Sequence, residues 1–285
     1  MMATVHTTRP ITPLLRSAVG RLRFSLRPFQ AFGGRLRYLL PRPRRFSGCY
    51  PDYQTALAAA RAAGAMPGYD HAEVAPVSFD RMCRVAPWDY PVLFWLQRLS
   101  PEVRTLVDAG GHMGTKYLAF RAQLAATWPE RWIVYDVPAI VEAGRQRAAT
   151  EGLMGLEFVS DLSKAGPADL LLGSGLLQYL DVPVSQLLLR MPALPPHLIL
   201  NKVAFRKGTP HVTLERIGPA LVPYQMRNEE AFLREVTALG YELIDRWSIP
   251  SLSHVIDTHP EKGASESAGF YFRLREARGR KDASD

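Results

Sequence analysis

The chain has 285 residues, 47% of them hydrophobic, so it can bury a large core in one domain with additions or in two small domains. No run of 18 or more apolar residues occurs, which argues against a transmembrane helix. The two cysteines, Cys49 and Cys83, form neither a CxxC pair nor a disulfide framework. This is typical of a reducing compartment, so we expect a cytoplasmic protein.

The net charge of +8 is concentrated at the N-terminus. Residues 1–45 contain ten arginines and no acidic residue, so residues 46–285 carry 25 basic and 27 acidic residues. The basic balance therefore belongs to an arginine-rich tail, and it gives no support to nucleic-acid binding by the body of the protein.

Within this tail, residues 12–28 read TPLLRSAVGRLRFSLRP and predict an amphipathic helix. Thr12 is the expected N-cap, Pro13 opens the helix and Pro28 ends it. Leucine, alanine and valine share one face and arginines lie opposite, a pattern of helices that lie on anionic membrane surfaces. A disordered leader, residues translated from an early start codon, and a transit peptide are alternatives.

Residues 46–100 are interpreted as a compact helical lead-in to the domain that follows. Residues 55–65 are rich in alanine, and residues 89–99 form a strongly apolar segment. Both patterns favour helices.

From residue 104 onward, strand and helix patterns alternate, which predicts an α/β fold with a doubly wound, Rossmann-like sheet. The last two strands have no helix between them, which predicts a terminal antiparallel strand. Seven strands ending in such a pair are the layout of the class I methyltransferase sheet. The stretch between the fifth strand and the next helix is interpreted as irregular. The strands are predicted at 104–110, 131–137, 156–162, 168–175, 197–205, 241–249 and 269–276.

The first strand ends in VDAGGHMG, a glycine-rich turn that leads into a helix. A turn at the carboxyl edge of such a sheet is where open α/β folds bind ligands. A bare backbone there indicates either a tight turn alone or a ligand close to the main chain. The sequence AGGHMG also fits a GxGxxG dinucleotide pattern with alanine for the first glycine. Asp136 ends the second strand. An acid at this position accepts hydrogen bonds from ribose hydroxyls, whether the ribose belongs to S-adenosylmethionine or to NAD.

VDAGGHMG resembles the first motif of S-adenosylmethionine-dependent methyltransferases. The resemblance implies that Asp108 lies near the methionine part of the cofactor and that the glycines let the backbone approach it. The chain departs from the motif at His112, which stands where the motif has its middle glycine; histidine tolerates a positive φ better than bulky residues do. The cofactor-binding residues expected on this basis are Asp108, Gly110, Gly111, His112, Gly114, Tyr117, Asp136, Asp161 and Ser174.

Further motifs, GGHMGTKY, W-x-V-x-D-x-P, SGLLQYL and VTLERIG, resemble a family of bacterial proteins described as methyltransferases of uncharacterised substrate. The resemblance covers about residues 46–275. It implies an S-adenosylmethionine-dependent methyltransferase domain over residues 101–276, followed by a disordered tail at 277–285. It does not identify the methyl acceptor, because fold does not fix function.

The expected catalytic residues are Tyr179, His211, Glu215 and His254, because each follows a strand at the carboxyl edge or lies in the loop of the last hairpin. Methyl transfer often needs a base that takes the proton of the acceptor. The spacing His254-x-x-Asp257-x-His259 resembles a metal site, but such spacing is common in loops, so no metal is expected. The long, polar loop at 250–268 favours a hydroxyl-rich acceptor over a lipid or a nucleic acid.

Three classes of function follow from these patterns. The first is an S-adenosylmethionine-dependent methyltransferase acting on a small or saccharide-like acceptor. The second is an NAD-type oxidoreductase, which the terminal strand pair and Asp108 disfavour. The third is a degenerate methyltransferase-like protein that binds a partner without catalysis. The oligomeric state stays open.

Overall fold

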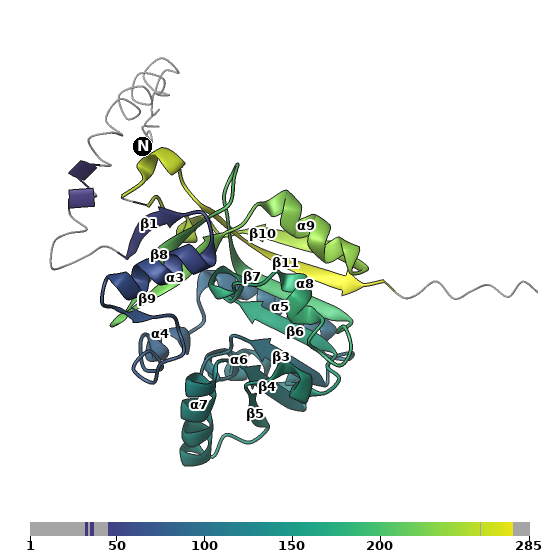
Figure 1. The fold of residues 1–285 in the computed structure, drawn as a ribbon. Helices are drawn as coiled ribbons and strands as arrows, with labels where there is room; N and C mark the ends of the chain where they lie inside the picture. The colour runs from purple at the N-terminus through teal and green to yellow at the C-terminus, as the bar shows by residue number, and fades with distance from the viewer. Residues whose placement is uncertain (1–31, 34, 37–44, 257, 276–285) are drawn as a thin grey trace, which may run out of the picture.

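A computed structural model describes residues 32–33, 35–36, 45–256 and 258–275 of the chain (Figure 1). The predicted tail helix, the predicted tail at 277–285 and Asp257 lie outside the described residues. Arg45 lies inside them. Its guanidinium hydrogen-bonds to Glu215 and lies over the Phe46 ring, so Arg45 is anchored to the body of the protein.

The large sheet has seven strands in the order β10-β11-β7-β6-β3-β4-β5. β11 is antiparallel to both β7 and β10, and β7, β6, β3, β4 and β5 are parallel neighbours. This confirms the predicted doubly wound sheet with a terminal antiparallel strand. The strands are β3 (Thr105–Ala109), β4 (Arg131–Tyr135), β5 (Leu156–Val159), β6 (Leu170–Ser174), β7 (His197–Phe205), β10 (Tyr241–Ser248) and β11 (Glu266–Leu274).

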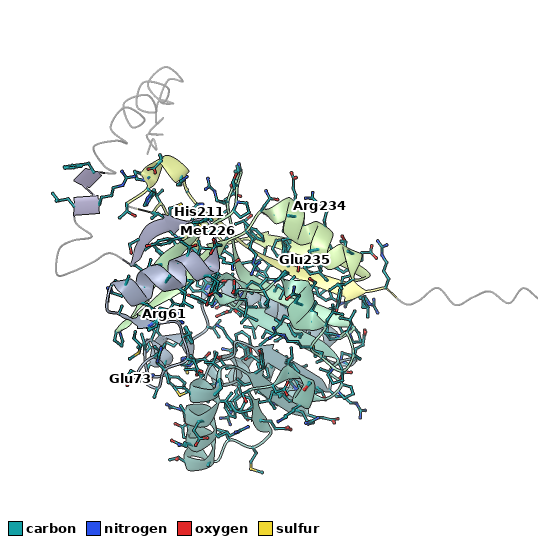
Figure 2. All side chains as sticks on the ribbon, viewed as in Figure 1. Arg61, Glu73, His211, Met226, Arg234 and Glu235 are labelled. Atoms are coloured by element: carbon teal, nitrogen blue, oxygen red, sulfur yellow. The ribbon has the colours of Figure 1, made fainter. Side chains whose placement is uncertain are left out.

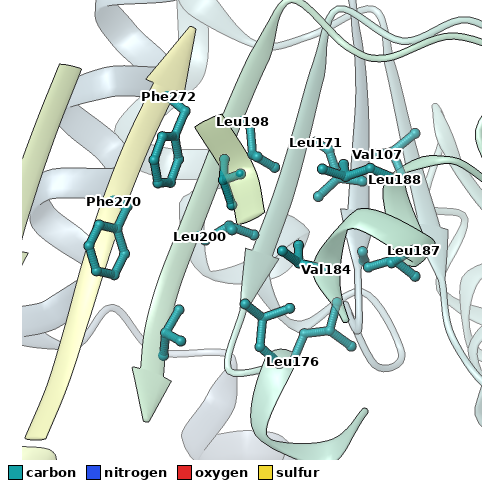
Figure 3. Close-up of a cluster of buried hydrophobic side chains, with 14 of the residues drawn as sticks. Val107, Leu171, Leu176, Val184, Leu187, Leu188, Leu198, Leu200, Phe270 and Phe272 are labelled. Carbon is teal, nitrogen blue, oxygen red and sulfur yellow. The ribbon is translucent and has the colours of Figure 1, made fainter. Parts of the chain in front are cut away.

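Helices cover both faces of this sheet, because successive strand residues point to opposite faces and both sets are apolar. Val107, Leu171 and Leu198 pack with α8 (Val184–Leu188) and α9 (Glu229–Ala238). Figure 3 shows Val184, Leu187 and Leu188 of α8 in this cluster. Leu106, Leu170 and Ile199, each one residue away, face the other side. There they pack with α5 (Tyr90–Leu99), α6 (Thr115–Leu124) and α7 (Pro138–Glu151).

A second sheet, β1-β8-β9-β2, corrects two predictions. The lead-in at 46–100 is not wholly helical: β1 (Phe46–Tyr50) and β2 (Met66–Pro67) flank α3 (Tyr53–Ala62), while α4 (Phe79–Met82) and η1 (Pro87–Asp89) precede α5. The stretch after β7 is not irregular, because β8 (His211–Ile217) and β9 (Ala220–Met226) form a hairpin closed by Gly218–Pro219. Figure 1 shows α3 and this sheet beside the end of β7.

The physical reason for both corrections is non-local pairing. β1 is five residues long, and its partner β8 lies more than 160 residues later in the chain. A segment that short carries no reliable period of its own. In β9, Pro223 argues against a strand, yet β2 pairs only with Ala220 and Leu221, so β9 has a free edge at the proline.

The remaining short elements are 3-10 turns: η2 (Ala125–Thr127), η3 (Leu162–Ala165), η4 (Leu177–Tyr179), η5 (Pro250–Leu252) and η6 (Pro260–Lys262). η4 directly follows β6 at the carboxyl edge, and its Tyr179 contacts Tyr224 of β9. The small sheet is thereby fixed next to the carboxyl ends of the parallel strands. No helix among the described residues is both long and apolar enough to span a bilayer.

Candidate functional site

The glycine-rich turn joins β3 to α6 and is tied to the end of β4. Gly110, His112 and Gly114 have φ values of 71°, 58° and 80°. His112 therefore adopts the left-handed conformation, which histidine tolerates better than bulky residues do. The backbone N–H of His112 donates to Asp136 Oδ2 at 2.8 Å, and the N–H of Gly110 donates to the Tyr135 carbonyl at 2.8 Å.

Packing within the chain itself requires the glycines of this turn. A Cβ at Gly111 would lie 2.6 Å from Cγ of Asp108, one at Gly110 would lie 2.9 Å from Leu176, and one at Gly114 would lie 2.8 Å from Leu156. The bare backbone thus has an internal explanation. A larger side chain at Gly111 would displace Asp108 before it met any ligand, so evidence for a ligand has to come from other atoms.

Asp108 supplies such evidence, since it is a buried carboxyl group with incomplete hydrogen bonding. It is 1% exposed, and Trp132 Nε1 donates to its Oδ2 at 3.2 Å. Its Oδ1 has no hydrogen-bond partner in the part of the chain that the structure describes. Burial raises the pKa of Asp108 to about 7, and the Trp132 hydrogen bond opposes that rise. A buried acceptor without a partner is rare unless a ligand or water completes it.

Asp136, at the end of β4, is the second carboxylate at this edge. Its oxygens accept from the backbone N–H groups of His112 and Val137, which fixes its position. Burial raises its pKa to about 6, and the negative charge of Asp70 adds to the shift. The residue keeps part of its surface accessible. Each oxygen still has a free lone pair, so Asp136 can accept hydrogen bonds from a diol.

The His112 ring is buried between the aromatic rings of Tyr69 and Phe79, with centroids 6.3 and 6.2 Å away. Burial lowers its pKa to about 4, so the imidazole is neutral at pH 7. Neither ring nitrogen has a partner among the described residues. His112 therefore offers one donor and one acceptor beside the turn.

The three other predicted cofactor residues differ in their surroundings. Ser174, at the end of β6, accepts a hydrogen bond from Asn201 and stays partly accessible at the carboxyl edge. Asp161 is exposed, and it caps η3 by accepting from the backbone and hydroxyl of Ser163. Tyr117 packs against Trp128 and Trp132, and its hydroxyl donates to the Met154 carbonyl at 2.7 Å. Its side chain therefore does not join Asp108, His112 and Asp136.

Two of the predicted catalytic residues, Tyr179 and Glu215, are in direct contact. The Tyr179 hydroxyl donates to Glu215 Oε2 at 2.6 Å, and Arg45 Nε donates to Glu215 Oε1 at 2.6 Å. The Glu215 side chain is only 3% exposed. Burial and the Glu215 carboxylate raise the pKa of Tyr179 well above its ordinary value. The group is thus a fixed hydrogen-bonded cluster, with Tyr179 held protonated.

His254 lies next to this cluster. Its ring stacks on Phe46, with centroids 4.0 Å apart and planes inclined by 7°, and meets the edge of Tyr224. Nδ1 lies 3.2 Å from the Leu252 carbonyl, while Nε2 is buried with no partner among the described atoms. Burial lowers the pKa of His254, so its neutral form dominates at pH 7. An unpartnered ring nitrogen on a neutral histidine can accept a proton or a hydrogen bond.

His211 lies apart from the other three predicted catalytic residues. It is the first residue of β8 and pairs with Met226 of β9; Figure 2 labels both residues. Glu215 lies four positions further along β8, which corresponds to about 13 Å. The charged neighbours of His211 are Arg206 and Lys262, and burial lowers its pKa to about 4.

Three residues at this edge were missed from the sequence: Tyr69, Asn201 and Lys202. Tyr69 contacts both His112 and Tyr179 and so links the turn to the cluster. The Asn201 amide donates to Trp88 and Ser174, and its oxygen accepts from Trp247. The signal was the pair Asn201–Lys202 inside the otherwise apolar strand HLILNKVAF, because polar residues are costly in a central strand.

Comparisons with known proteins give partial structural overlaps. No protein-family model and no curated protein matches the sequence. The chain is similar to the magnesium protoporphyrin IX methyltransferase of Synechocystis PCC 6803, solved with bound S-adenosylmethionine (TM-score 0.41, 17% identity, 65% of this chain and 77% of that one).

Two proteins of Burkholderia thailandensis also overlap with the chain. One is the 1,6-didemethyltoxoflavin-N1-methyltransferase, solved with bound 1,6-didemethyltoxoflavin and S-adenosylhomocysteine (TM-score 0.46, 17% identity, 67% of this chain and 79% of that one). The other is an O-methyltransferase family protein (TM-score 0.46, 15% identity, 70% of this chain and 59% of that one). These overlaps are partial, so they establish no activity for this chain.

Proposed function

We propose that the protein is an S-adenosylmethionine-dependent methyltransferase acting on a small or saccharide-like acceptor. The observation that carries the proposal is the buried Oδ1 of Asp108, which has no partner among the described residues and lies beside a turn tied to Asp136. A cofactor with an ammonium group and a ribose diol matches these two carboxylates, because the ammonium satisfies the first and the diol donates to the second.

Within this proposal, the residues at the carboxyl edge of the large sheet have separate roles. The cofactor supplies a methyl group made electrophilic by its sulfonium. Asp108 binds the ammonium, Asp136 binds the ribose, and His112 offers further hydrogen bonds. His254 is the strongest candidate for the proton acceptor, because Nε2 is unpartnered and the ring is neutral. Tyr179 and Glu215 position the acceptor, since each is already engaged by the other.

The two alternative functions predict different ligands. Asp136 would serve the ribose of NAD equally well, so an oxidoreductase would be stabilised by NAD. A degenerate protein, in which the His112 ring fills the cofactor position, would bind neither nucleotide. Thermal unfolding with S-adenosylmethionine, S-adenosylhomocysteine and NAD separates the three, because a ligand of the native state raises the unfolding midpoint. We expect the first two ligands to raise the midpoint and NAD to leave it unchanged.

The acceptor is best sought by mass spectrometry after incubation with S-adenosylmethionine and a panel of nucleotide sugars. We expect His254→Gln to abolish transfer while S-adenosylhomocysteine binding persists. His211→Gln is the matched control, because His211 is a buried histidine that lies about 13 Å along β8 from Glu215. Equal loss of transfer in both variants would remove His254 from this role.

A further inference from the structure

Lys202 occupies a β-bulge in the middle of the sheet. Between the pairs Leu200–Phe270 and Val203–Ala268, β7 contains two residues where β11 contains only Gly269. Lys202 has a φ of 58°, in the left-handed region that lysine rarely adopts. A bulge changes the direction of a side chain, and bulges are over-represented next to active sites. Strain of this kind persists only where the surrounding structure enforces it.

The bulge brings the Lys202 side chain over the turn that follows β6. A Cβ added to Gly175 would lie 3.0 Å from both Cε and Nζ of Lys202, and 3.6 Å from Nε2 of Gln178. Gly175 follows β6, the strand between β3 and β7. Lys202 therefore lies across β6 from the Gly110 turn, on the same side as Tyr179.

The Lys202 ammonium has no counterion among the described residues. The acidic groups around it are Asp89, Asp108 and Glu215. Asp89 is paired with Lys116, whose Nζ lies 2.7 Å from Oδ2, and Glu215 is paired with Arg45. None of the three carboxylates of Asp89, Asp108 and Glu215 lies within ion-pair distance of the Lys202 ammonium. Gln178, beside it, has a buried Oε1 that lacks a partner in the described part of the chain.

We propose that Lys202 binds an anionic group of the methyl acceptor, a carboxylate or a phosphate, so that the acceptor is an acidic sugar or similar small acid. This rests on the proposed methyltransferase function. The residue is partly accessible, so a ligand can reach it. Burial lowers the pKa of Lys202 to about 8, with the charge of Lys116 adding to the shift. An anion beside Lys202 would reverse that shift, because an opposite charge favours the ammonium.

The test is to follow the Lys202 ammonium directly. The chain has six lysines, so carbon-13 labelling of lysine gives few ε-carbon signals. The Lys202 signal is the one missing in Lys202→Met. We expect inorganic phosphate or acetate, at an ionic strength matched with sodium chloride, to raise the pKa of Lys202 by about one unit. Lys207, whose side chain is 91% exposed, is the control and should not respond. No response of Lys202 to either anion would overturn the proposal.

S-adenosylhomocysteine, which has its own carboxylate, distinguishes the two sources of the anion. If it raises the pKa of Lys202 as phosphate does, and binds Lys202→Met at least tenfold more weakly, the anion belongs to the cofactor and the acceptor assignment is overturned. Equal binding to parent, Lys202→Met and Lys202→Arg supports the acceptor assignment. A phosphate response without any S-adenosylhomocysteine binding supports the anion site and overturns the methyltransferase proposal instead.

Discussion

Replacement of Asp108 by asparagine should change how stability depends on pH. The pKa of Asp108 is raised from an ordinary value of 3.8 to about 7, chiefly by burial. The folded protein therefore keeps this proton between about pH 4 and pH 7, while the unfolded chain releases it. Stability attributable to Asp108 is present at low pH and is lost as the pH rises through this window.

The size of the effect follows from the shift. About three pKa units correspond to about 4 kcal/mol, at about 1.4 kcal/mol per unit. Asparagine has no such titration and keeps an acceptor for Trp132. We therefore expect the stability of Asp108→Asn relative to the parent to rise by about 4 kcal/mol from pH 4 to pH 8 and then to level off. The buried amide adds an offset that does not depend on pH.

Urea unfolding of both proteins at a series of pH values measures this difference, in which titrating groups that do not interact with Asp108 cancel. Asp161→Asn is the matched control, because the contribution of Asp161 to stability changes with pH in the opposite direction. Asp161 is exposed, and its hydrogen bonds with Ser163 lower its pKa, so its contribution is present above pH 4 and lost as the pH falls. A difference between Asp108→Asn and the parent that stays constant with pH would refute a buried carboxyl at this position.

Three further predictions concern stability. Lys116→Met should lower the free energy of unfolding in urea by about 4 kcal/mol, because Asp89 would remain buried without its partner. Arg131→Met, in an exposed pair, should lower it by at most about 1 kcal/mol, and equal losses would contradict the buried pair. Removing residues 1–44 should leave the unfolding midpoint nearly unchanged. Removing Arg45 as well should lower the free energy of unfolding by about 2 kcal/mol, because Glu215 loses a charged donor, and no difference between the two truncations would contradict this. Gly144→Ala should lower the melting midpoint, because the new Cβ would lie 2.3 Å from Phe158, and an unchanged midpoint would show that the two side chains are not packed this closely.

Sequence reasoning predicted the large sheet because its signals are local. The parallel strands are short, largely apolar runs, and a helical pattern separates each from the next, except that only a brief link joins β5 to β6. The small sheet was missed because its pairing is non-local: β1 has no pattern of its own, and β9 contains Pro223. A period of two in Val212, Leu214 and the Gly218 turn was the available signal for the hairpin.

The candidate site was predicted only in part, for a similar reason. Asp108 and Asp136 end predicted strands, so topology places them at one edge. The contact between Tyr179 and Glu215 depends on how the hairpin packs on η4, which no local pattern encodes. The bulge that directs Lys202 to the same edge depends on its register with β11. Residues placed by strand ends were therefore predictable, and residues placed by tertiary packing were not.

Calorimetric titration of S-adenosylhomocysteine into the parent and into Asp108→Asn tests the central claim most directly. A charge-assisted hydrogen bond contributes about 1.5–3 kcal/mol, so the variant should bind about tenfold to a hundredfold more weakly. Because Asp108→Asn is expected to stay folded at pH 8, such a loss would not come from unfolding. Equal affinity in the two proteins, or no binding to the parent, would contradict a cofactor site at Asp108 and the Gly110 turn.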